Sequence, residues 1–252
     1  MGYNLHWAAE QKYTTRSSVN QIRHLNNLIA GMKSDGDWSN FDCFWMFAVE
    51  ATDQATWNFV SPGTFDCTLV NAPTFTAKQG YAGNGSSMYI GSGWDVGTNA
   101  NKFTVDTASF GVYARTAGSG GTNDMGAVTA ESAGFAGSAM LNTYTDGRAY
   151  CSINDNGTAA SDAAGPGRTG FLSMNRTTST AYVFKRNGTD VYSSTKASTT
   201  NTTDFHVMRT NGATNQYYSN KQYSMAFIGA GTLNHANLNT RVTNYLTAVG
   251  AI

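Results

Sequence analysis

Charge is scarce in this sequence. Charged side chains make up only 13% of the 252 residues, and 16 basic side chains are balanced by 16 acidic ones. Soluble domains usually carry about 25%. Without a basic excess, a nucleic-acid-binding protein held by phosphate contacts is disfavoured. A disordered tail would combine high net charge with few aromatics, whereas 12% of this chain is aromatic.

Glutamate and long apolar runs are also nearly missing. Glutamate occurs only at Glu10, Glu50 and Glu131, which disfavours a long helical bundle rich in Glu, Lys and Leu. The longest apolar run, residues 44–49, is far shorter than the ~20 residues that cross a bilayer. The first eleven residues contain neither the basic nor the apolar segment of a signal peptide.

Cysteine is rare as well. The chain has Cys43, Cys67 and Cys151, with no C-x-x-C spacing. An odd number in this pattern indicates neither a disulfide framework nor a zinc site. We therefore expect buried free thiols in a protein made in a reducing cytoplasm.

What the chain does contain favours strands and tight turns. It has 27 glycines, 13 tyrosines and 13 phenylalanines, among many Thr, Ser, Asn and Ala residues. From residue 41 onward the apolar period is two, which predicts roughly a dozen short strands. Among them are strands over 56–60 and 205–209. The dipeptides Asp146-Gly147 and Asn187-Gly188 predict two-residue hairpin turns.

Helical periodicity brackets this β-rich region. Apolar positions from 19 to 32 predict a helix over 18–33, capped by Ser17 or Ser18. A second apolar stripe predicts a helix over 234–249, with Asn234 as N-cap and Gly250 as terminator. The interior shows no linker and no strict repeat. We therefore predict one domain over 17–252.

An aromatic arm over residues 1–16 is predicted to precede this domain. Its rings would dock on the body or on a neighbouring subunit, and the interface residues we nominate are Tyr3, Trp7 and Tyr13.

Three stretches of the chain together resemble a known group of domains. These are 61–87, with the segments SPGTFD, NAPTFT and GYAGNGSS; the hairpin 182–188, YVFKRNG; and 226–233, AFIGAGTL, which leads into the last helix. The pattern resembles the concanavalin A-like, or laminin G-like, domains of tailed-bacteriophage and prophage virion proteins. The resemblance covers residues 20 to 252. It implies an all-β, antiparallel jelly-roll sandwich, used in phages for host attachment or as an accessory head or tail component.

The sequence lacks the pattern of carboxylates that sugar hydrolysis usually needs. The fold family includes glucanases, in which Glu and Asp alternate on one strand as E-x-D-x-E, and most glycosidases use two carboxylates at a fixed separation. Here Glu50 and Asp53 form the nearest pair, without a third carboxylate beside them. The sequence therefore predicts that the protein is not an enzyme and has no cofactor; a glycan hydrolase or lyase is a distant alternative.

No metal site is predicted either. The acidic segments 35–37 and 154–157 offer oxygen ligands but do not continue as calcium loops. They are better interpreted as a helix stop and a turn. A calcium site built from residues of distant loops is an alternative that the sequence leaves open.

Aromatic residues in polar, loop-like contexts are the remaining functional signal. Trp94, Tyr217 and Tyr218 lie in such contexts, and we nominate them as carbohydrate-binding residues, with rings that cover the sandwich edge as the alternative.

Two functions follow from these features. The first is a non-enzymatic phage virion protein, a head or tail decoration or fibre component. It would contact other virion proteins and copies of itself, as a homo-oligomer such as a trimer, and adhere to host-surface glycan. The alternative is a carbohydrate-binding receptor-recognition module. Neither involves nucleic acid or membrane insertion.

Overall fold

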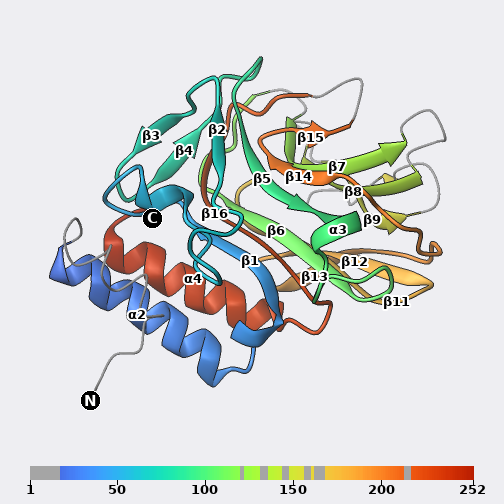
Figure 1. Ribbon diagram of the computed structural model, residues 1–252, viewed down its shortest axis with the longest axis horizontal. Coiled ribbons are helices and arrows are strands. Elements are labelled where there is room, and N and C mark those ends of the chain that lie inside the picture. The colour runs from blue at the N-terminus through green and yellow to red at the C-terminus, as the bar shows by residue number, and fades with distance from the viewer. Residues whose placement is uncertain are drawn as a thin grey trace.

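Two β-sheets pack face to face in the computed structural model of the protein (Figure 1). The structure describes residues 18–119, 122–130, 136–143, 148–155, 160–161, 168–212 and 217–252. Within these ranges each sheet has eight strands, and every pairing is antiparallel except the one between β15 and β7. The predicted all-β jelly-roll sandwich with two flanking helices is confirmed.

The first sheet, called here the β6 sheet, has the order β13-β12-β11-β6-β16-β4-β3, and β1 also pairs with β16. Its strands are β1 (Phe41–Met46), β3 (Thr74–Thr76), β4 (Gly80–Ala82), β6 (Ala108–Ala114), β11 (Gly170–Thr178), β12 (Ala181–Arg186), β13 (Thr189–Ser194) and β16 (Gln222–Gly229).

The second sheet, called here the β14 sheet, has the order β10-β9-β8-β7-β14-β5-β2, and β15 also pairs with β7. Its strands are β2 (Thr68–Val70), β5 (Tyr89–Asp95), β7 (Thr122–Ala130), β8 (Ala136–Thr143), β9 (Ala149–Asp155), β10 (Ala160–Ser161), β14 (Asp204–Val207) and β15 (Thr210–Asn211).

The core lies between the two sheets. Phe110 on β6 meets Phe205 on β14 with ring centroids 5.0 Å apart. Phe103 lies beside them, 5.8 Å from Phe205. Such tilted aromatic pairs add about 0.5–1.5 kcal/mol beyond the apolar area they bury. The three cysteines are buried free thiols, as predicted, and burial raises the pKa of the Cys151 thiol to about 12.

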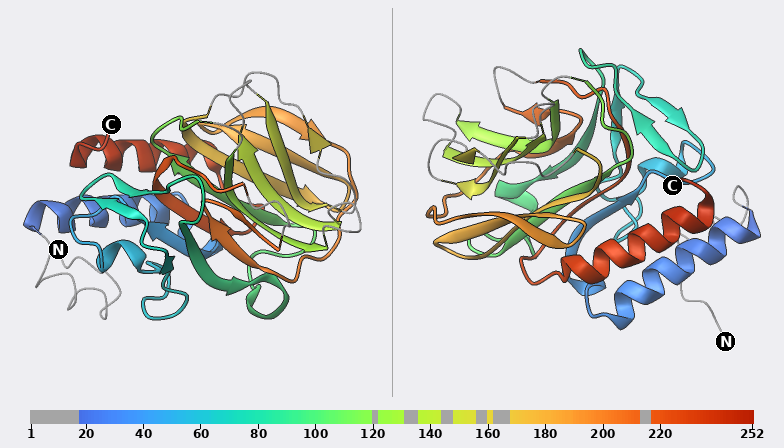
Figure 2. Two further views of the ribbon diagram at one scale, coloured as in Figure 1. Left: turned by 90° about the horizontal axis from the view of Figure 1, so that it is seen from above. Right: turned by 180° about the vertical axis from the view of Figure 1, so that it is seen from behind.

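Two helices cover the outer face of the β6 sheet (Figure 2). They are α2 (Val19–Ser34) and α4 (His235–Val249), which pack against each other. The His235 ring contacts Ser109 Oγ on β6 at 3.0 Å and Ser173 Oγ on β11 at 2.7 Å. Because Phe110 points into the core, its neighbour Ser109 points to the opposite face. Helix α4 therefore lies outside the sandwich.

The helix ends are those that the sequence predicts. Ser18 Oγ accepts a hydrogen bond from the Gln21 amide at 3.2 Å, and Asn234 Oδ1 accepts one from the Asn237 amide at 3.1 Å. Gly250 ends α4 in the left-handed region at φ 78°. No helix in the described ranges is long and apolar enough to cross a membrane.

The predicted strand over 56–60 is wrong. The 3-10 turn η2 (Gln54–Thr56) and a single bridge at Asn58 occupy this stretch. The Asn58 side chain accepts from the amides of Phe44 at 3.1 Å and Val60 at 3.2 Å, and donates to the Thr64 carbonyl at 3.0 Å. A buried amide side chain thus supplies the partners that a strand ladder would have supplied. Two further short helices lie within the described ranges, the 3-10 turn η1 (Trp38–Asn40) and α3 (Val96–Asn99).

The Asn187-Gly188 hairpin between β12 and β13 is confirmed. Both turn residues have positive φ, 50° and 80°, which is the geometry of a type I′ turn. The Asp146-Gly147 hairpin lies outside the described residues.

Candidate functional site

Trp94 does not form part of a binding surface, which corrects its nomination. Its side chain is only 1% exposed and packs edge-on against Phe103, with ring centroids 5.6 Å apart. Trp94 lies near the end of β5, where successive side chains alternate between faces. Its polar sequence neighbours suggested a loop, but the ring takes the inward position and fills the core.

The two nominated tyrosines lie in the segment between β15 and β16. Tyr217 is 49% exposed, and its carbonyl accepts a hydrogen bond from the Asn123 amide at 2.9 Å. Tyr218 is half-buried and lies 6.3 Å, between ring centroids, from Tyr89 on β5. The interface residues Tyr3, Trp7 and Tyr13 lie outside the described residues.

Tyr218 belongs to a group of aromatic and polar side chains on the outer face of the β14 sheet. We call it the outer-face cluster. Figure 1 shows the strands that carry it, β5, β14 and β15, close together on the side of the sandwich away from α2 and α4. Its members are Tyr89, Asp204, His206, Arg209, Asn211 and Tyr218.

Strand alternation places the first members of the cluster. Phe205 points into the core, so His206, the next residue of β14, points outward. His206 pairs with Gly91 of β5, where a Cβ would lie 3.7 Å from the imidazole. Tyr89, two residues before Gly91, shares this face and stacks on His206, with centroids 4.7 Å apart and planes inclined by 25°.

Arg209 joins the aromatic rings of the cluster. Met208, at φ 75°, turns the chain out of β14. The guanidinium of the next residue, Arg209, lies over the Tyr89 ring, 3.7 Å from its centroid. It donates hydrogen bonds to His206 Nδ1 at 2.9 Å and to the Tyr218 hydroxyl at 3.1 Å. A cation over an aromatic face is worth about 0.5–2 kcal/mol, depending on its desolvation, so these contacts hold the side chain in one position.

A carboxylate and an amide complete the cluster. Asp204 Oδ2 lies 3.0 Å from His206 Nε2. The side-chain amide of Asn211 donates to the backbone carbonyl of Asp204 at 3.1 Å and also to the carboxylate oxygen Oδ1 of Asp204. Burial alone would raise the pKa of Asp204, but its hydrogen bond to His206 and the nearby charges of His206 and Arg209 outweigh it, so this pKa lies below its usual value. Asp204 is therefore an anionic acceptor at neutral pH, with its side chain 34% exposed.

This arrangement offers several kinds of binding group. It combines amphipathic rings, a fixed cation, a carboxylate and a primary amide within a small area. The rings can contact the apolar parts of a hydroxyl-rich ligand, and the polar groups can form hydrogen bonds with its hydroxyls.

Five of the six cluster residues were not identified from the sequence. The signal was present as Asp204, His206, Arg209 and Asn211, spaced over eight residues. Strand alternation puts Asp204 and His206 on one face. It does not predict the turn at Met208, nor that Tyr89 and Tyr218 pack against them.

Glu50, the first carboxylate considered for catalysis, holds a helix end instead. It accepts hydrogen bonds from the Ser18 amide at 2.7 Å and the Ser18 hydroxyl at 2.8 Å, and lies 3.4 Å from Lys78 Nζ. Burial would raise the pKa of Glu50, but the Ser18 hydrogen bonds and the Lys78 charge lower it below its usual value. A glycosidase acid needs the opposite shift.

Metal ligands do not gather in the part of the chain that the structure describes. No group of three or more His, Cys, Asp or Glu side chains lies in position to hold an ion there. The segment 35–37 ends helix α2, as predicted, with Asp35 as C-cap.

Comparisons with known proteins identify solved structures with a similar fold. No family and no curated protein sequence matches this chain. Solved structures do match. A mutant Trypanosoma rangeli sialidase displaying trans-sialidase activity is similar with a TM-score of 0.55 and 10% identity, over 90% of this chain and 40% of that one. Trypanosoma rangeli sialidase in complex with 2,3-difluorosialic acid has a TM-score of 0.58 and 10% identity, over 83% and 33%.

A toxin domain shares the same architecture. The binding domain of botulinum neurotoxin DC in complex with SialylT is similar with a TM-score of 0.50 and 10% identity, over 81% of this chain and 52% of that chain. The protein thus spans between a third and about half of the length of these solved chains. At such identities the likeness shows the fold alone, which is a sandwich of two mainly antiparallel β-sheets.

The comparison corrects one prediction. The sequence predicted that the protein is not an enzyme, but the solved structures that share its fold include sialidases. A shortage of alternating carboxylates argues only against glucanase-type chemistry, and the fold itself occurs in chains that act on glycans.

Proposed function

We propose that this protein binds carbohydrate and that the outer-face cluster is its binding site. The observation that carries the proposal is the stacked group of Tyr89, His206 and Arg209, with the Asp204 carboxylate beside it, on the sheet opposite the helices. The structural relatives add support, because two of them are described in complex with SialylT and with 2,3-difluorosialic acid.

The chemistry of the cluster fits a sugar. A pyranose ring has an apolar C–H face, which an aromatic ring such as Tyr89 can contact, and an equatorial rim of hydroxyl groups. The Asp204 carboxylate accepts hydrogen bonds from hydroxyls, and the Asn211 amide both donates and accepts. Binding would leave the guanidinium of Arg209 in place, because its cation–π and hydrogen-bond contacts already fix it.

The test is a binding measurement with matched variants. A glycan array that includes sialylated, neutral and bacterial cell-surface sugars identifies a ligand, and calorimetry then gives its Kd. We expect Tyr89→Ala to weaken binding about tenfold, equivalent to about 1.4 kcal/mol, and Asp204→Asn to weaken it as well. Tyr192→Ala is the control, since Tyr192 is another half-buried tyrosine but lies on β13 of the β6 sheet.

Two results would overturn this proposal. One is a folded protein that binds no glycan on the array at millimolar concentration. The other is a ligand whose affinity falls as much with the control substitution as with Tyr89→Ala.

We propose in addition that the protein works on a tailed-bacteriophage particle, as a head or tail accessory component that contacts other virion proteins and copies of itself. The sequence resemblance of residues 20–252 supports this setting, as does a neutral surface that does not depend on charge steering. Mass spectrometry and antibody labelling of purified particles test it, together with light scattering for the oligomer. A protein absent from the particles and monomeric in solution would refute it.

A further inference from the structure

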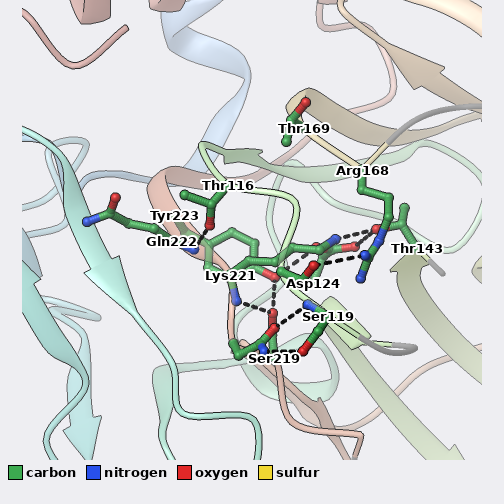
Figure 3. A network of polar contacts seen from close by, with 12 residues as sticks. Thr116, Ser119, Asp124, Thr143, Arg168, Thr169, Ser219, Lys221, Gln222 and Tyr223 are labelled. Atoms are coloured by element: carbon green, nitrogen blue, oxygen red, sulfur yellow. Dashed lines mark hydrogen bonds and ion pairs between the residues drawn. The ribbon is translucent and has the colours of Figure 1, made fainter. Parts of the chain in front are cut away.

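A lysine and an aspartate are buried together inside the sandwich. Lys221 immediately precedes β16 of the β6 sheet, and Asp124 lies on β7 of the β14 sheet. Both side chains are 0% exposed, and Lys221 Nζ lies 2.6 Å from Asp124 Oδ1 (Figure 3). The two residues are 97 positions apart in the sequence. Their contact therefore joins the two sheets directly.

Hydroxyl groups surround both oxygens of the carboxyl group. The Tyr223 hydroxyl donates to Asp124 Oδ1 at 2.8 Å, and the Thr143 hydroxyl donates to Oδ2 at 2.7 Å. Lys221 Nζ also donates to the Thr143 oxygen. Thr143 thus bridges the amine and the second carboxyl oxygen, as the dashed contacts in Figure 3 show.

The surroundings disfavour charge on the amine. Burial lowers the pKa of Lys221, the Asp124 carboxylate opposes this shift, and the charge of Arg168 adds to it. Burial and the neighbouring Asp124 raise the pKa of Tyr223, so its hydroxyl keeps the proton that it donates. Transfer of one proton from amine to carboxyl converts a buried ion pair into two neutral groups and removes the cost of burying two charges.

We propose that Lys221 and Asp124 form an intramolecular isopeptide bond, a covalent cross-link between the two sheets. The motivating observation is the fully buried amine in contact with a carboxyl group whose two oxygens already accept hydroxyl hydrogen bonds. This cross-link is independent of any glycan site, because it lies in the interior.

The reaction balances without any further reactant. The neutral amine nitrogen of Lys221 attacks the Asp124 carboxyl carbon, and a C–N bond forms. Oδ1, held by the Tyr223 hydroxyl, becomes the amide oxygen. The C–Oδ2 bond breaks, and Oδ2 leaves as water with two protons: the one that the ammonium gave to the carboxyl group and one that passes from the attacking nitrogen through the Thr143 hydroxyl. One amine hydrogen stays on the amide, and no atom is oxidised or reduced.

Folding brings the amine and the carboxyl group together and removes water from around them. In general, holding two groups in reacting geometry is equivalent to an effective concentration of about 10⁵–10⁸ M, and here the fold holds Lys221 Nζ 2.6 Å from Asp124 Oδ1. The site also excludes bulk water, which would otherwise favour hydrolysis. The bond is therefore expected only in the folded protein.

The test is the mass of the intact, denatured chain. We expect the folded wild-type protein to be lighter than its sequence by one water molecule. Trypsin should fail to cut after Lys221, and its digest should contain one branched peptide that joins the segments carrying Lys221 and Asp124. On a denaturing gel the cross-linked chain should migrate faster than an unlinked one, because a 97-residue separation is closed into a loop.

Two variants separate the chemistry from the fold. Lys221→Arg keeps a buried cation but cannot form this bond, so its chain should have the full sequence mass. Thr143→Val keeps both reacting groups and removes the proposed proton relay, so linking should slow by about a hundredfold, in the range of proton-transfer catalysis. Circular dichroism confirms that each variant is folded.

Two outcomes overturn the proposal. One is a folded wild-type chain that keeps its full sequence mass after prolonged incubation. The other is a water loss that maps elsewhere, such as a succinimide at Asp146-Gly147, which hydroxylamine cleaves and an isopeptide bond resists. The wild-type mass decides the matter even if Lys221→Arg fails to fold.

Discussion

Acid should weaken this protein through one buried histidine. The His235 ring sits between Ser109 and Ser173 at the start of α4 and is only 3% exposed. Burial, with a smaller effect from the Lys185 charge, lowers the pKa of His235 from 6.5 to about 3. The folded protein therefore keeps this imidazole neutral at pH values where the unfolded chain protonates it.

The sign of the effect follows from proton linkage. Below pH 6.5 the unfolded state binds one more proton than the folded state, so the free energy of unfolding falls as pH falls. Each pH unit in this window removes about 1.4 kcal/mol. Because the unfolded imidazole is only half protonated at pH 6.5, the loss between pH 6.5 and about pH 4.5 is about 2 kcal/mol, and the contribution is fully present well above pH 6.5.

The assay is urea unfolding followed by circular dichroism, for the wild type and His235→Gln. Glutamine cannot titrate, and it leaves one of the two serines without its partner, at a cost of about 1–3 kcal/mol at neutral pH. Carboxylates with lowered pKa, such as Asp204 and Glu50, also lose stabilising interactions in acid, in both proteins. The informative quantity is therefore the difference between the two curves, which should shrink as the pH falls toward 4.5.

Parallel curves would refute the reasoning. They would mean that the folded protein accepts a proton on His235 as easily as the unfolded chain does. A protonated ring would need contact with solvent or with a carboxylate, and its neighbours Ser109 and Ser173 provide neither.

Three further predictions follow from packing. Trp94→Ala should lower the free energy of unfolding by about 3–5 kcal/mol in urea melts, because it empties a core position; a loss below about 1 kcal/mol would contradict the burial of this ring. Gly111→Ala should cost about 1–3 kcal/mol in the same assay, since a Cβ there would lie 2.4 Å from a carbonyl oxygen of the neighbouring strand, and an unchanged midpoint would show that the strands can separate. The thiols of Cys43, Cys67 and Cys151 should not react with a hydrophilic thiol reagent until the protein unfolds, and rapid labelling of the native protein would contradict this.

Local rules predicted the helix ends and one hairpin from the sequence. Ser18 and Asn234 cap their helices, Gly250 ends α4, and Asn187-Gly188 turns the chain between β12 and β13. Each of these features depends on backbone conformation and hydrogen bonds within a few residues, so neighbouring side chains suffice to specify it.

The candidate site could not be predicted from such local patterns. Tyr89, His206 and Tyr218 belong to three separated segments, and only strand pairing brings them into contact. Trp94 shows the complementary error, because the side of the sheet on which a ring falls depends on register rather than on the polarity of its sequence neighbours. The Lys221–Asp124 contact spans the two sheets and has no local signal at all.

By itself, the sequence determined the strand-rich class of fold, the helix ends and one hairpin turn. The period-two pattern, scarce glutamate and turn-forming Gly and Asn residues predict a strand-rich domain bracketed by two helices. The tertiary structure alone decided which side chains face outward and which polar groups are buried as partners. The physical reason is that composition and periodicity act over a few residues, whereas burial and pairing depend on contacts between segments far apart in the chain.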